Sequence, residues 1–185
     1  METRNVLILG AKGMLGQELV RVYREDGRYS VAAWDYEEID VTDFAVAEQK
    51  IRACAPDLII NAAAYNAVDQ CEESKEEYEK ALLLNAEAPG FLARLAKDLD
   101  ATFVHYSTDY VFDGESQEGY TEDTEPNPIS KYGMSKREGE KNVIAVFSKG
   151  EKGEEKGVKG KYYIVRLSKL FGKPATSAMG KKSLF

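Results

Sequence analysis

The chain has 185 residues, of which 43% are hydrophobic and 31% charged, a balance typical of one globular domain with a single core. A formal net charge of −7 without a basic cluster argues against nucleic-acid binding. The apolar runs are far shorter than the roughly 20 residues of a membrane helix, and no signal peptide is visible. Two cysteines and one histidine without ligand spacing predict no metal site and no disulfide framework, so we expect a protein of the reducing cytoplasm.

The first half of the chain alternates strand and helix patterns. Asn5–Leu9 is a short apolar run followed by a glycine, as expected of a buried parallel strand. Met14–Glu25 places its apolar residues at helical spacing, and Tyr29–Trp34 is predicted to form the second strand. A helix is expected over about residues 40–53, where aspartate and threonine suit a helix N-terminus.

The second half continues this alternation. A long helix expected over about residues 76–98 contains Pro89 and Gly90, which predict an interruption or a kink. The remaining predicted elements are the strand Asp57–Asn61, the strand Ala101–Tyr106, the helix Ser130–Phe147 and the strand Tyr162–Leu167.

The alternation predicts an α/β protein with a Rossmann-type, doubly wound parallel sheet and helices on both faces. We expect residues 1–185 to form one domain of this kind. Ser148–Lys161 breaks the pattern because it is rich in glycine and charge and nearly free of apolar residues. We expect a mobile surface loop there.

Three glycines lie where the first strand ends and the first helix begins. Glycine lets the backbone turn tightly and approach a pyrophosphate, and the helix N-terminus supplies N–H donors and a positive dipole end. The strand–loop–helix context makes this pattern far more specific than the glycines alone. The predicted dinucleotide contacts of the loop are Gly10, Lys12, Gly13, Met14, Leu15 and Gly16.

Two residues near this loop give conflicting signals about the cofactor. Asp35, 19 residues after Gly16, can accept hydrogen bonds from the adenosine ribose of NAD. Lys12, within the loop, would instead favour the 2′-phosphate of NADP. We therefore expect NADH to be used and NADPH to be tolerated.

Small and acidic residues further along the chain complete the predicted cofactor site. Asp40 and Val41 are candidates for the adenine edge. Ala62, Ala63 and Ala64 follow the third predicted strand, and their small side chains permit close approach to a cofactor. The same alanine run also suits a plain strand-to-helix connection.

Tyr132 and Lys136 stand four residues apart in a predicted helix and therefore share one helix face. There the ammonium is expected to lower the pKa of the phenol from about 10, so that Tyr132 can act as a general acid or base. The hydroxyl of Thr108 can polarise the same substrate oxygen. The spacing alone is common on helix surfaces, but beside a dinucleotide loop it predicts a catalytic set of Thr108, Tyr132 and Lys136.

The chain resembles the extended short-chain dehydrogenase/reductase superfamily and, within it, the dTDP-4-dehydrorhamnose reductase family. STDYVFDG followed by YGMSK is specific to this subfamily, whereas the glycine loop is shared more widely. The matching segments keep the family's order over nearly the whole chain. They are GAKGMLG (Gly10–Gly16), PDLIINAAAYNAVDQCE (Pro56–Glu72), HYSTDYVFDG (His105–Gly114), YGMSKREGE (Tyr132–Glu140) and VRLSKLFG (Val165–Gly172).

The resemblance implies reduction of the 4-keto group of a nucleotide sugar, dTDP-4-dehydro-L-rhamnose, with NADH or NADPH. Tyr132 would protonate the developing alkoxide, and Thr108 would hydrogen-bond the carbonyl oxygen. Lys136 would bind the nicotinamide ribose and lower the pKa of Tyr132. The cofactor would supply the hydride chemistry and the protein the positioning.

The resemblance also adds residues around this set. Tyr65 and Tyr106 join the cofactor site, and Asp109 the substrate site. Lys169 stands where the family commonly has a Trp that contacts substrate, so it removes an aromatic platform and adds a charge that could meet a diphosphate. The exact sugar nucleotide and the oligomeric state, a homodimer included, stay open.

Two alternatives stay open beside a reductase. One is a non-catalytic dinucleotide-binding subunit that regulates a partner. The other is an epimerase or dehydratase relative, which Tyr110 opposes because similar 4,6-dehydratases carry Glu at this position. Family members are longer, with a C-terminal part that builds the sugar-nucleotide pocket, so we expect cofactor affinity with weak or absent turnover from residues 1–185.

Overall fold

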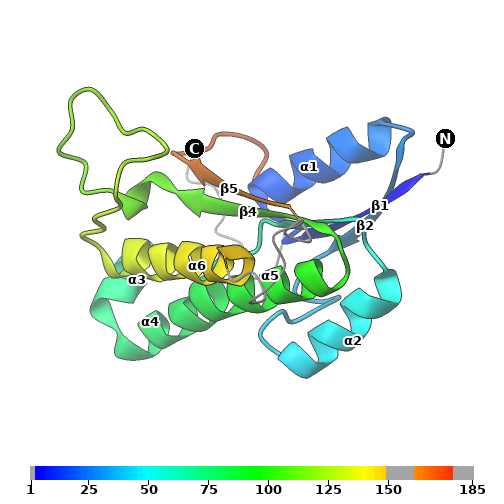
Figure 1. Ribbon diagram of the computed structural model, residues 1–185. Coiled ribbons are helices and arrows are strands. Elements are labelled where there is room, and N and C mark those ends of the chain that lie inside the picture. Colours follow the sequence, from blue (N-terminus) through cyan, green and yellow to red (C-terminus); the bar gives the residue numbers. More distant parts are fainter. Residues whose placement is uncertain (1–2, 149–160, 177–185) are drawn as a thin grey trace.

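The computed structural model describes residues 3–148 and 161–176, and a five-stranded parallel sheet lies at its centre (Figure 1). The strand order is β2-β1-β3-β4-β5, so the predicted Rossmann-type α/β class is confirmed. The strands are β1 (Arg4–Leu9), β2 (Tyr29–Trp34), β3 (Leu58–Asn61), β4 (Thr102–Thr108) and β5 (Tyr162–Leu167).

The strand order creates a switch point between β1 and β3. From β1 the chain moves outward to β2, and it then returns past β1 to build β3, β4 and β5 on the other side. Ligands of such sheets bind in the crevice at the carboxyl ends of the strands beside the switch point. Leu9 pairs with Asn61 there, so the glycine loop and the alanine run leave the sheet side by side.

Helices pack on both faces of the sheet (Figure 1). They are α1 (Met14–Glu25), α2 (Phe44–Cys54), α3 (Val68–Glu73), α4 (Lys75–Leu82), α5 (Ala88–Asp98) and α6 (Lys131–Ser148), with a π-helical turn η1 (Leu83–Glu87) and a 3-10 turn η2 (Asp109–Val111). Helix α1 packs against Val6 and Ile8, whereas α2, α5 and α6 pack against the opposite face around Leu7 and Leu9. Within residues 3–148 and 161–176, no helix is long and apolar enough to cross a membrane.

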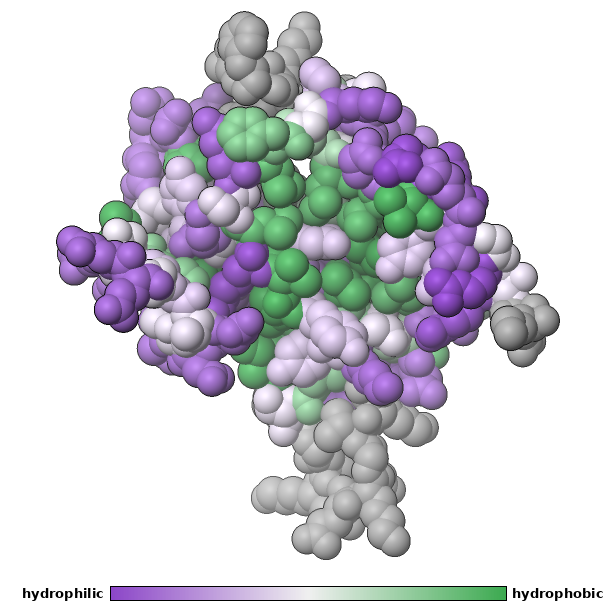
Figure 2. Space-filling view, turned by 90° about the horizontal axis from the view of Figure 1, so that it is seen from above, coloured by the Kyte–Doolittle hydropathy of each residue, from purple (hydrophilic) through white to green (hydrophobic). Residues whose placement is uncertain are grey.

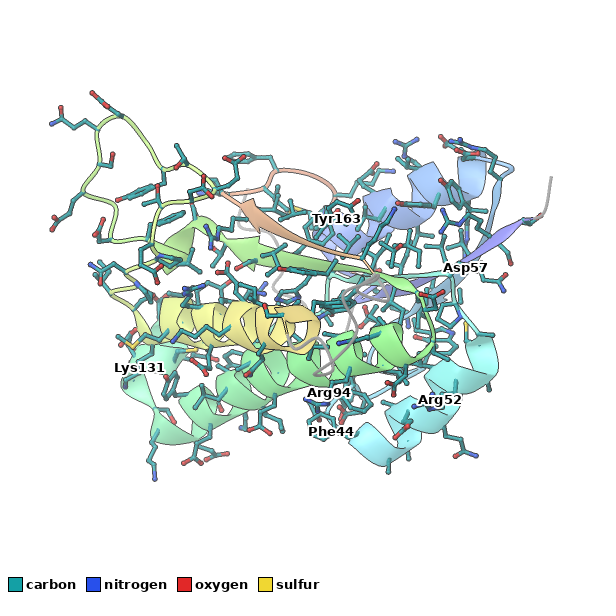
Figure 3. The ribbon with its side chains drawn as sticks, viewed as in Figure 1. Phe44, Arg52, Asp57, Arg94, Lys131 and Tyr163 are labelled. Carbon is teal, nitrogen blue, oxygen red and sulfur yellow. The ribbon has the colours of Figure 1, made fainter. Side chains whose placement is uncertain are left out.

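Within the described residues, one face of the sheet is covered by α1 alone, and the other sheet-covering helices pack on the opposite face. Val104 on β4 and Val165 on β5 are only partly buried there, and Tyr163 is 56% exposed. Figure 2 views the molecule from this side and shows apolar side chains across the middle of the face. Figure 3 labels Tyr163 on β5. Most of the buried core therefore lies on the other face, under the three remaining sheet-covering helices.

The predicted helix over residues 76–98 forms as one path in three parts, α4, η1 and α5. Pro89 has no N–H, and its ring would clash with the carbonyl of Asn85 in a regular helix. The chain instead widens into a π turn, in which the Ala88 N–H donates to the Leu83 carbonyl. Asn142 of α6 then donates to the Ala86 carbonyl oxygen at 3.0 Å. The expected interruption is confirmed, and it lies just before Pro89.

Two details differ from the prediction and one lies outside the structure. Helix α3 was not predicted, because its six residues are too few for a clear apolar period. Strand β4 extends two residues further than predicted, to Thr108. Of the loop expected over Ser148–Lys161, residues 149–160 lie outside the described residues.

Candidate functional site

The loop after β1 depends on three glycines with different roles. Gly10 has φ +75°, and a Cβ there would lie 2.6 Å from the Ala63 backbone nitrogen, so a side chain does not fit. A Cβ at Gly16 would overlap the Gly10 carbonyl oxygen, so this glycine lets α1 pack on the loop. Among the described atoms, a Cβ at Gly13 would meet only the Gly10 carbonyl oxygen, at 3.2 Å. Gly13 therefore keeps the backbone open toward the crevice.

Helix α1 begins directly after this opening. Its N-cap is Gly13, so no side chain caps the first turn. The N–H groups of such a turn and the positive end of the helix dipole form a site for a phosphate. The predicted contacts Met14 and Leu15 lie in this turn and are partly buried.

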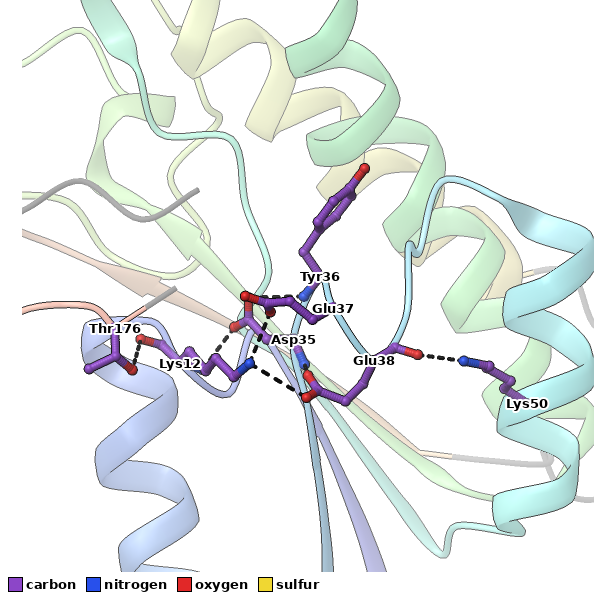
Figure 4. Close-up of polar contacts among 7 residues, drawn as sticks. All are labelled: Lys12, Asp35, Tyr36, Glu37, Glu38, Lys50 and Thr176. Atoms are coloured by element: carbon purple, nitrogen blue, oxygen red, sulfur yellow. Dashed lines mark hydrogen bonds and ion pairs between the residues drawn. The ribbon is translucent and has the colours of Figure 1, made fainter. Parts of the chain in front are cut away.

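Asp35 follows β2 and braces the glycine loop (Figure 4). It is 7% exposed, and its Oδ2 accepts a hydrogen bond from the Lys12 N–H at 2.8 Å. Its Oδ1 accepts a hydrogen bond from the Tyr36 N–H at 2.9 Å. A carboxylate offers about four acceptor sites, so this bracing is compatible with the predicted ribose contact.

The side chain of Lys12 pairs with two further carboxylates. Its Nζ lies 3.0 Å from Glu37 Oε2 and 3.5 Å from Glu38 Oε1. The hydrogen bond to Glu37 is the largest cause that raises the pKa of Lys12. The Asp35 N–H donates to Glu38 Oε2 at 2.9 Å and is the largest cause that holds the pKa of Glu38 below its usual range. The ammonium group of Lys12, which was expected to favour a 2′-phosphate, is thus already paired with two carboxylates.

The other predicted cofactor residues fall into two groups. Val41 is 6% exposed and part of the core, and Asp40 Oδ1 accepts hydrogen bonds from the Thr42 N–H at 2.9 Å and hydroxyl at 2.6 Å. Both residues shape the turn before α2, and their adenine contact stays a prediction. The alanine run does lie in the crevice, because the backbone of Ala62 and Ala63 packs against Gly10.

Thr108 and Tyr132 come together at the carboxyl end of β4. They are 7% and 9% exposed, and the Thr108 side chain lies near enough to Tyr132 to act on the pKa of the phenol. Thr108 Oγ1 also donates to Asp109 Oδ1 at 3.1 Å and accepts from the Tyr110 N–H at 3.2 Å. The structure therefore brings together the hydroxyl pair that the sequence predicted, with the Asp109 carboxylate beside it.

The pKa of Tyr132 moves in the direction opposite to the one expected from the sequence. Burial is the largest cause and raises this pKa to about 12, although the neighbouring Thr108 side chain lowers it. Lys136 was expected to lower it, but its Nζ donates a hydrogen bond to the Tyr106 carbonyl oxygen at 2.7 Å. Tyr132 is consequently a protonated phenol at neutral pH.

Lys136 is itself buried, with 2% of its surface exposed. Burial lowers its pKa to about 8, against the opposing influence of the Glu140 carboxylate. Its hydrogen-bond partner is the backbone of Tyr106, whereas the Tyr106 side chain packs with the cluster under α1. Tyr106 thus reaches this site through its carbonyl group, and its predicted contact with the cofactor stays a prediction.

Asn85 and Ser135 form a buried brace that the sequence did not reveal as one unit. Asn85 Oδ1 accepts from the Tyr65 N–H, and its Nδ2 donates to the Tyr65 carbonyl oxygen, both at 2.8 Å. The same Nδ2 donates at 3.0 Å to Ser135 Oγ, which donates to the Tyr132 carbonyl oxygen at 2.7 Å. Both side chains are fully buried, so they fix the loop after β3 against α6.

His105 is a packed, hydrogen-bonded histidine. It is fully buried, and its Nδ1 lies 3.2 Å from Asn61 Nδ2. Asn61 Oδ1 accepts from the Ala63 N–H at 3.2 Å, so the amide nitrogen faces the imidazole and donates to it. Burial holds the pKa of His105 well below its usual value, so the ring is neutral. Its contact supports the alanine run rather than the reacting atoms.

The segment after β5 returns to the glycine loop. The Thr176 N–H donates to the Lys12 carbonyl oxygen at 2.9 Å, and Gln17 Nε2 donates to the Pro174 carbonyl oxygen at 2.9 Å. Lys169 lies at the start of this segment, with its Nζ 5.7 Å from the centre of the Phe171 ring. The contact of Lys169 with a substrate diphosphate stays a prediction.

This geometry, on this sheet, defines the class of the chain as a Rossmann-type α/β fold with the glycine loop typical of dinucleotide-binding domains. The chain belongs to the dTDP-4-dehydrorhamnose reductase family. The family model described as RmlD substrate binding domain matches residues 4–182.

Relatives agree with this assignment. The chain is 39% identical to the dTDP-4-dehydrorhamnose reductase of Aggregatibacter actinomycetemcomitans, over 78% of this chain and 48% of that protein. It is 42% identical to the probable low-salt glycan biosynthesis reductase Agl14 of Haloferax volcanii, over 74% of this chain and 47% of that protein. The chain thus spans about half the length of the curated relatives it matches.

Solved structures show the same fold. The dTDP-4-dehydrorhamnose reductase of Bacillus anthracis, solved in complex with NADP, matches with a TM-score of 0.81 and 34% identity. The match covers 95% of this chain and 57% of that one. The ortholog from Clostridium acetobutylicum matches with a TM-score of 0.79 and 39% identity, over 91% of this chain and 54% of that one.

Proposed function

We propose that this chain binds NADH or NADPH and serves the reduction of the 4-keto group of a nucleotide sugar, dTDP-4-dehydro-L-rhamnose. The observation that carries the proposal is the buried pair of hydroxyl groups of Thr108 and Tyr132 at the end of β4, with Lys136 on the same helix as Tyr132. The names of the relatives and the NADP complex of one of them support it.

The crevice suits a dinucleotide. The opening at Gly13 and the uncapped start of α1 would receive the pyrophosphate, and Asp35 would accept the adenosine ribose hydroxyls. Ala62 allows close approach of the cofactor, and Lys136 would hold the nicotinamide ribose. A bound reduced nicotinamide supplies the hydride for a ketone carbon.

The protein's own part is proton donation and charge stabilisation. Tyr132, with its pKa raised to about 12, keeps the proton that the new alkoxide oxygen must receive. Thr108 would turn its hydroxyl from Asp109 to the substrate oxygen and share the negative charge that develops there. Lys136 would supply positive charge for the phenolate that Tyr132 leaves behind.

Cofactor binding is tested first, because it needs no turnover. Gly13→Ala places a methyl group at the opening for the pyrophosphate, so we expect NADH to bind at least about tenfold more weakly in a fluorescence titration. Gly27→Ala is the matched control, since a Cβ there meets nothing within 4 Å among the described atoms. Equal affinities of the two variants would contradict the proposed pyrophosphate site.

The chemistry is tested by NADH oxidation with dTDP-4-dehydro-L-rhamnose. Tyr132→Phe should lower turnover by about 10² to 10⁴, because a general acid contributes that much, while NADH affinity stays unchanged. Equal rates for wild type and Tyr132→Phe would eliminate Tyr132 as the acid.

We also propose a cell compartment and an oligomeric state for the protein. Cys54 and Cys71 form no disulfide bond within the described residues, which suits the reducing cytoplasm. A homodimer is the assembly to test by sedimentation velocity. A single species of 20.6 kDa at micromolar concentration would contradict it.

A further inference from the structure

Three acidic residues contact Lys12 at the end of β2, two through its ammonium group and one through its backbone N–H (Figure 4). Lys12 Nζ pairs with Glu37 and Glu38, and these side chains are 37%, 43% and 42% exposed. Asp35 lies beneath them, 7% exposed, and holds the Lys12 N–H. The backbone and the side chain of one lysine are thus both engaged by acidic residues.

A second lysine lies nearby but on the other side of Glu38. Lys50 Nζ donates to the Glu38 carbonyl oxygen at 2.6 Å, and Figure 4 shows it on the side of α2, away from Lys12. Lys12 is therefore the cation that faces the glycine loop in this cluster.

The position of the cluster matters because of what distinguishes the two cofactors. In dinucleotide-binding folds the acidic residue after the second strand contacts the adenosine ribose 2′-hydroxyl. In NADPH a phosphate replaces the hydrogen of that hydroxyl, so the phosphate lies among the same side chains. Around Asp35 those side chains are Lys12, Glu37 and Glu38.

We infer that Glu37 and Glu38 are specificity-determining residues that make this chain prefer NADH to NADPH by keeping Lys12 from the 2′-phosphate. The inference rests on the proposed function and deepens it by choosing between the two cofactors. Glu37 and Glu38 lie outside the predicted catalytic set.

Charge balance, rather than the strength of the ion pairs, carries the inference. Exposed ion pairs are weak, so pairing alone would not hold Lys12 in place. If Lys12 turned to a 2′-phosphate, Glu37 and Glu38 would be left unpaired beside a group of about −1.5 to −2 charge. NADH instead brings a hydroxyl that can donate to Asp35 and leaves both pairs intact.

The test is a set of fluorescence titrations with NADH and with NADPH. Wild type should bind NADH more tightly. Glu37→Gln/Glu38→Gln keeps both side-chain lengths and an acceptor for the Asp35 N–H, and it frees Lys12. The ratio of the NADPH to the NADH dissociation constant should therefore fall by about tenfold, which corresponds to about 1.4 kcal/mol.

Lys12→Met separates the role of the lysine from that of total charge. Added to wild type, it should not lower the ratio, because it leaves Glu37 and Glu38 unpaired beside the 2′-phosphate. Added to Glu37→Gln/Glu38→Gln, it should remove most of the gain for NADPH. A gain that survives in the triple variant would overturn the role assigned to Lys12.

A matched control keeps the change in net charge but moves it to α4. Glu76→Gln/Glu79→Gln alters two exposed glutamates that pair with Lys80 and Lys75. This variant should leave the cofactor ratio unchanged. Higher ionic strength should narrow the preference of wild type for NADH, since exposed charges are screened.

The outcomes separate the inference from the proposed function. If wild type binds neither dinucleotide, the proposed function fails. If it binds both, and the ratio stays the same in Glu37→Gln/Glu38→Gln, only the specificity inference is overturned. A wild-type preference for NADPH would overturn it as well.

Discussion

Lys136 places an ammonium group where only 2% of the residue is exposed, and burial lowers its pKa to about 8 from a usual 10.5. The hydrogen bond to the Tyr106 carbonyl oxygen and the charge of Glu140 offset part of this cost. Below about pH 8 the folded chain carries a charge that the unfolded chain accommodates more easily in water. A residue kept at a cost to stability suits a role in binding, such as the proposed hold on the nicotinamide ribose.

Lys136→Met should stabilise the fold at neutral pH by about 2 kcal/mol, the cost of the lowered pKa less one lost hydrogen bond. The gain should shrink as the pH rises from about 8 toward 10.5, because the unfolded wild type then also releases this proton. Urea unfolding across this pH range measures both effects. The control Lys141→Met, on the exposed side of α6, should change stability by less than about 0.5 kcal/mol. A pH-independent loss of stability in Lys136→Met would contradict the account.

At the scale of elements, α6 approaches its neighbours closely because of two glycines. A Cβ at Gly133 would overlap the Tyr110 carbonyl oxygen of η2, and a Cβ at Gly139 would overlap the Asn85 carbonyl oxygen of η1. Gly133 follows Tyr132 in the chain, and η2 follows Thr108. The contact between α6 and η2 therefore sets the spacing of the two hydroxyl groups.

Gly133→Ala should push η2 away from α6 and separate Thr108 from Tyr132. We expect a loss of about 1–3 kcal/mol in unfolding free energy from overpacking, and a fall in turnover of about 10²-fold from misplacement. Gly90→Ala is a stability-matched control, because its Cβ would lie 2.9 Å from Asn142 Cβ, on the side of α6 away from the hydroxyl pair. It should lose stability and retain turnover. Similar turnover losses in both variants would argue against a specific role of the α6–η2 contact.

The elements differ in how far the sequence predicts them, for physical reasons. Strands β1 and β2 and helix α1 follow local apolar patterns, and α1 and β2 match the prediction at both ends. The turn η1 depends on distant partners, Tyr65 and Ser135, which no local pattern contains. The glycine loop was predictable because its roles are local. The direction of the Tyr132 pKa was not, because it depends on burial and on where Lys136 points in the folded chain.

At the scale of the whole molecule, the crevice joins segments from both ends of the chain. Residues 174–176 hydrogen-bond the glycine loop through Gln17 and Lys12, more than 150 residues away in sequence. The walls of the crevice also belong to the neighbouring strands β1, β2 and β3. A ligand bound there contacts elements that form only when the whole fold is present, so binding and folding should be linked.

NADH should therefore raise the global stability of the chain. At a concentration of about 100 times the dissociation constant, linkage gives about 2.7 kcal/mol, which for a chain of this length is a rise in Tm of roughly 5–10 °C. Differential scanning calorimetry with and without NADH measures the shift. Gly13→Ala should lose about half of the shift or more at the same NADH concentration, whereas Gly27→Ala should keep it. An unchanged Tm of the wild type at saturating NADH would contradict binding in the crevice, because a ligand that binds only the folded chain must stabilise it.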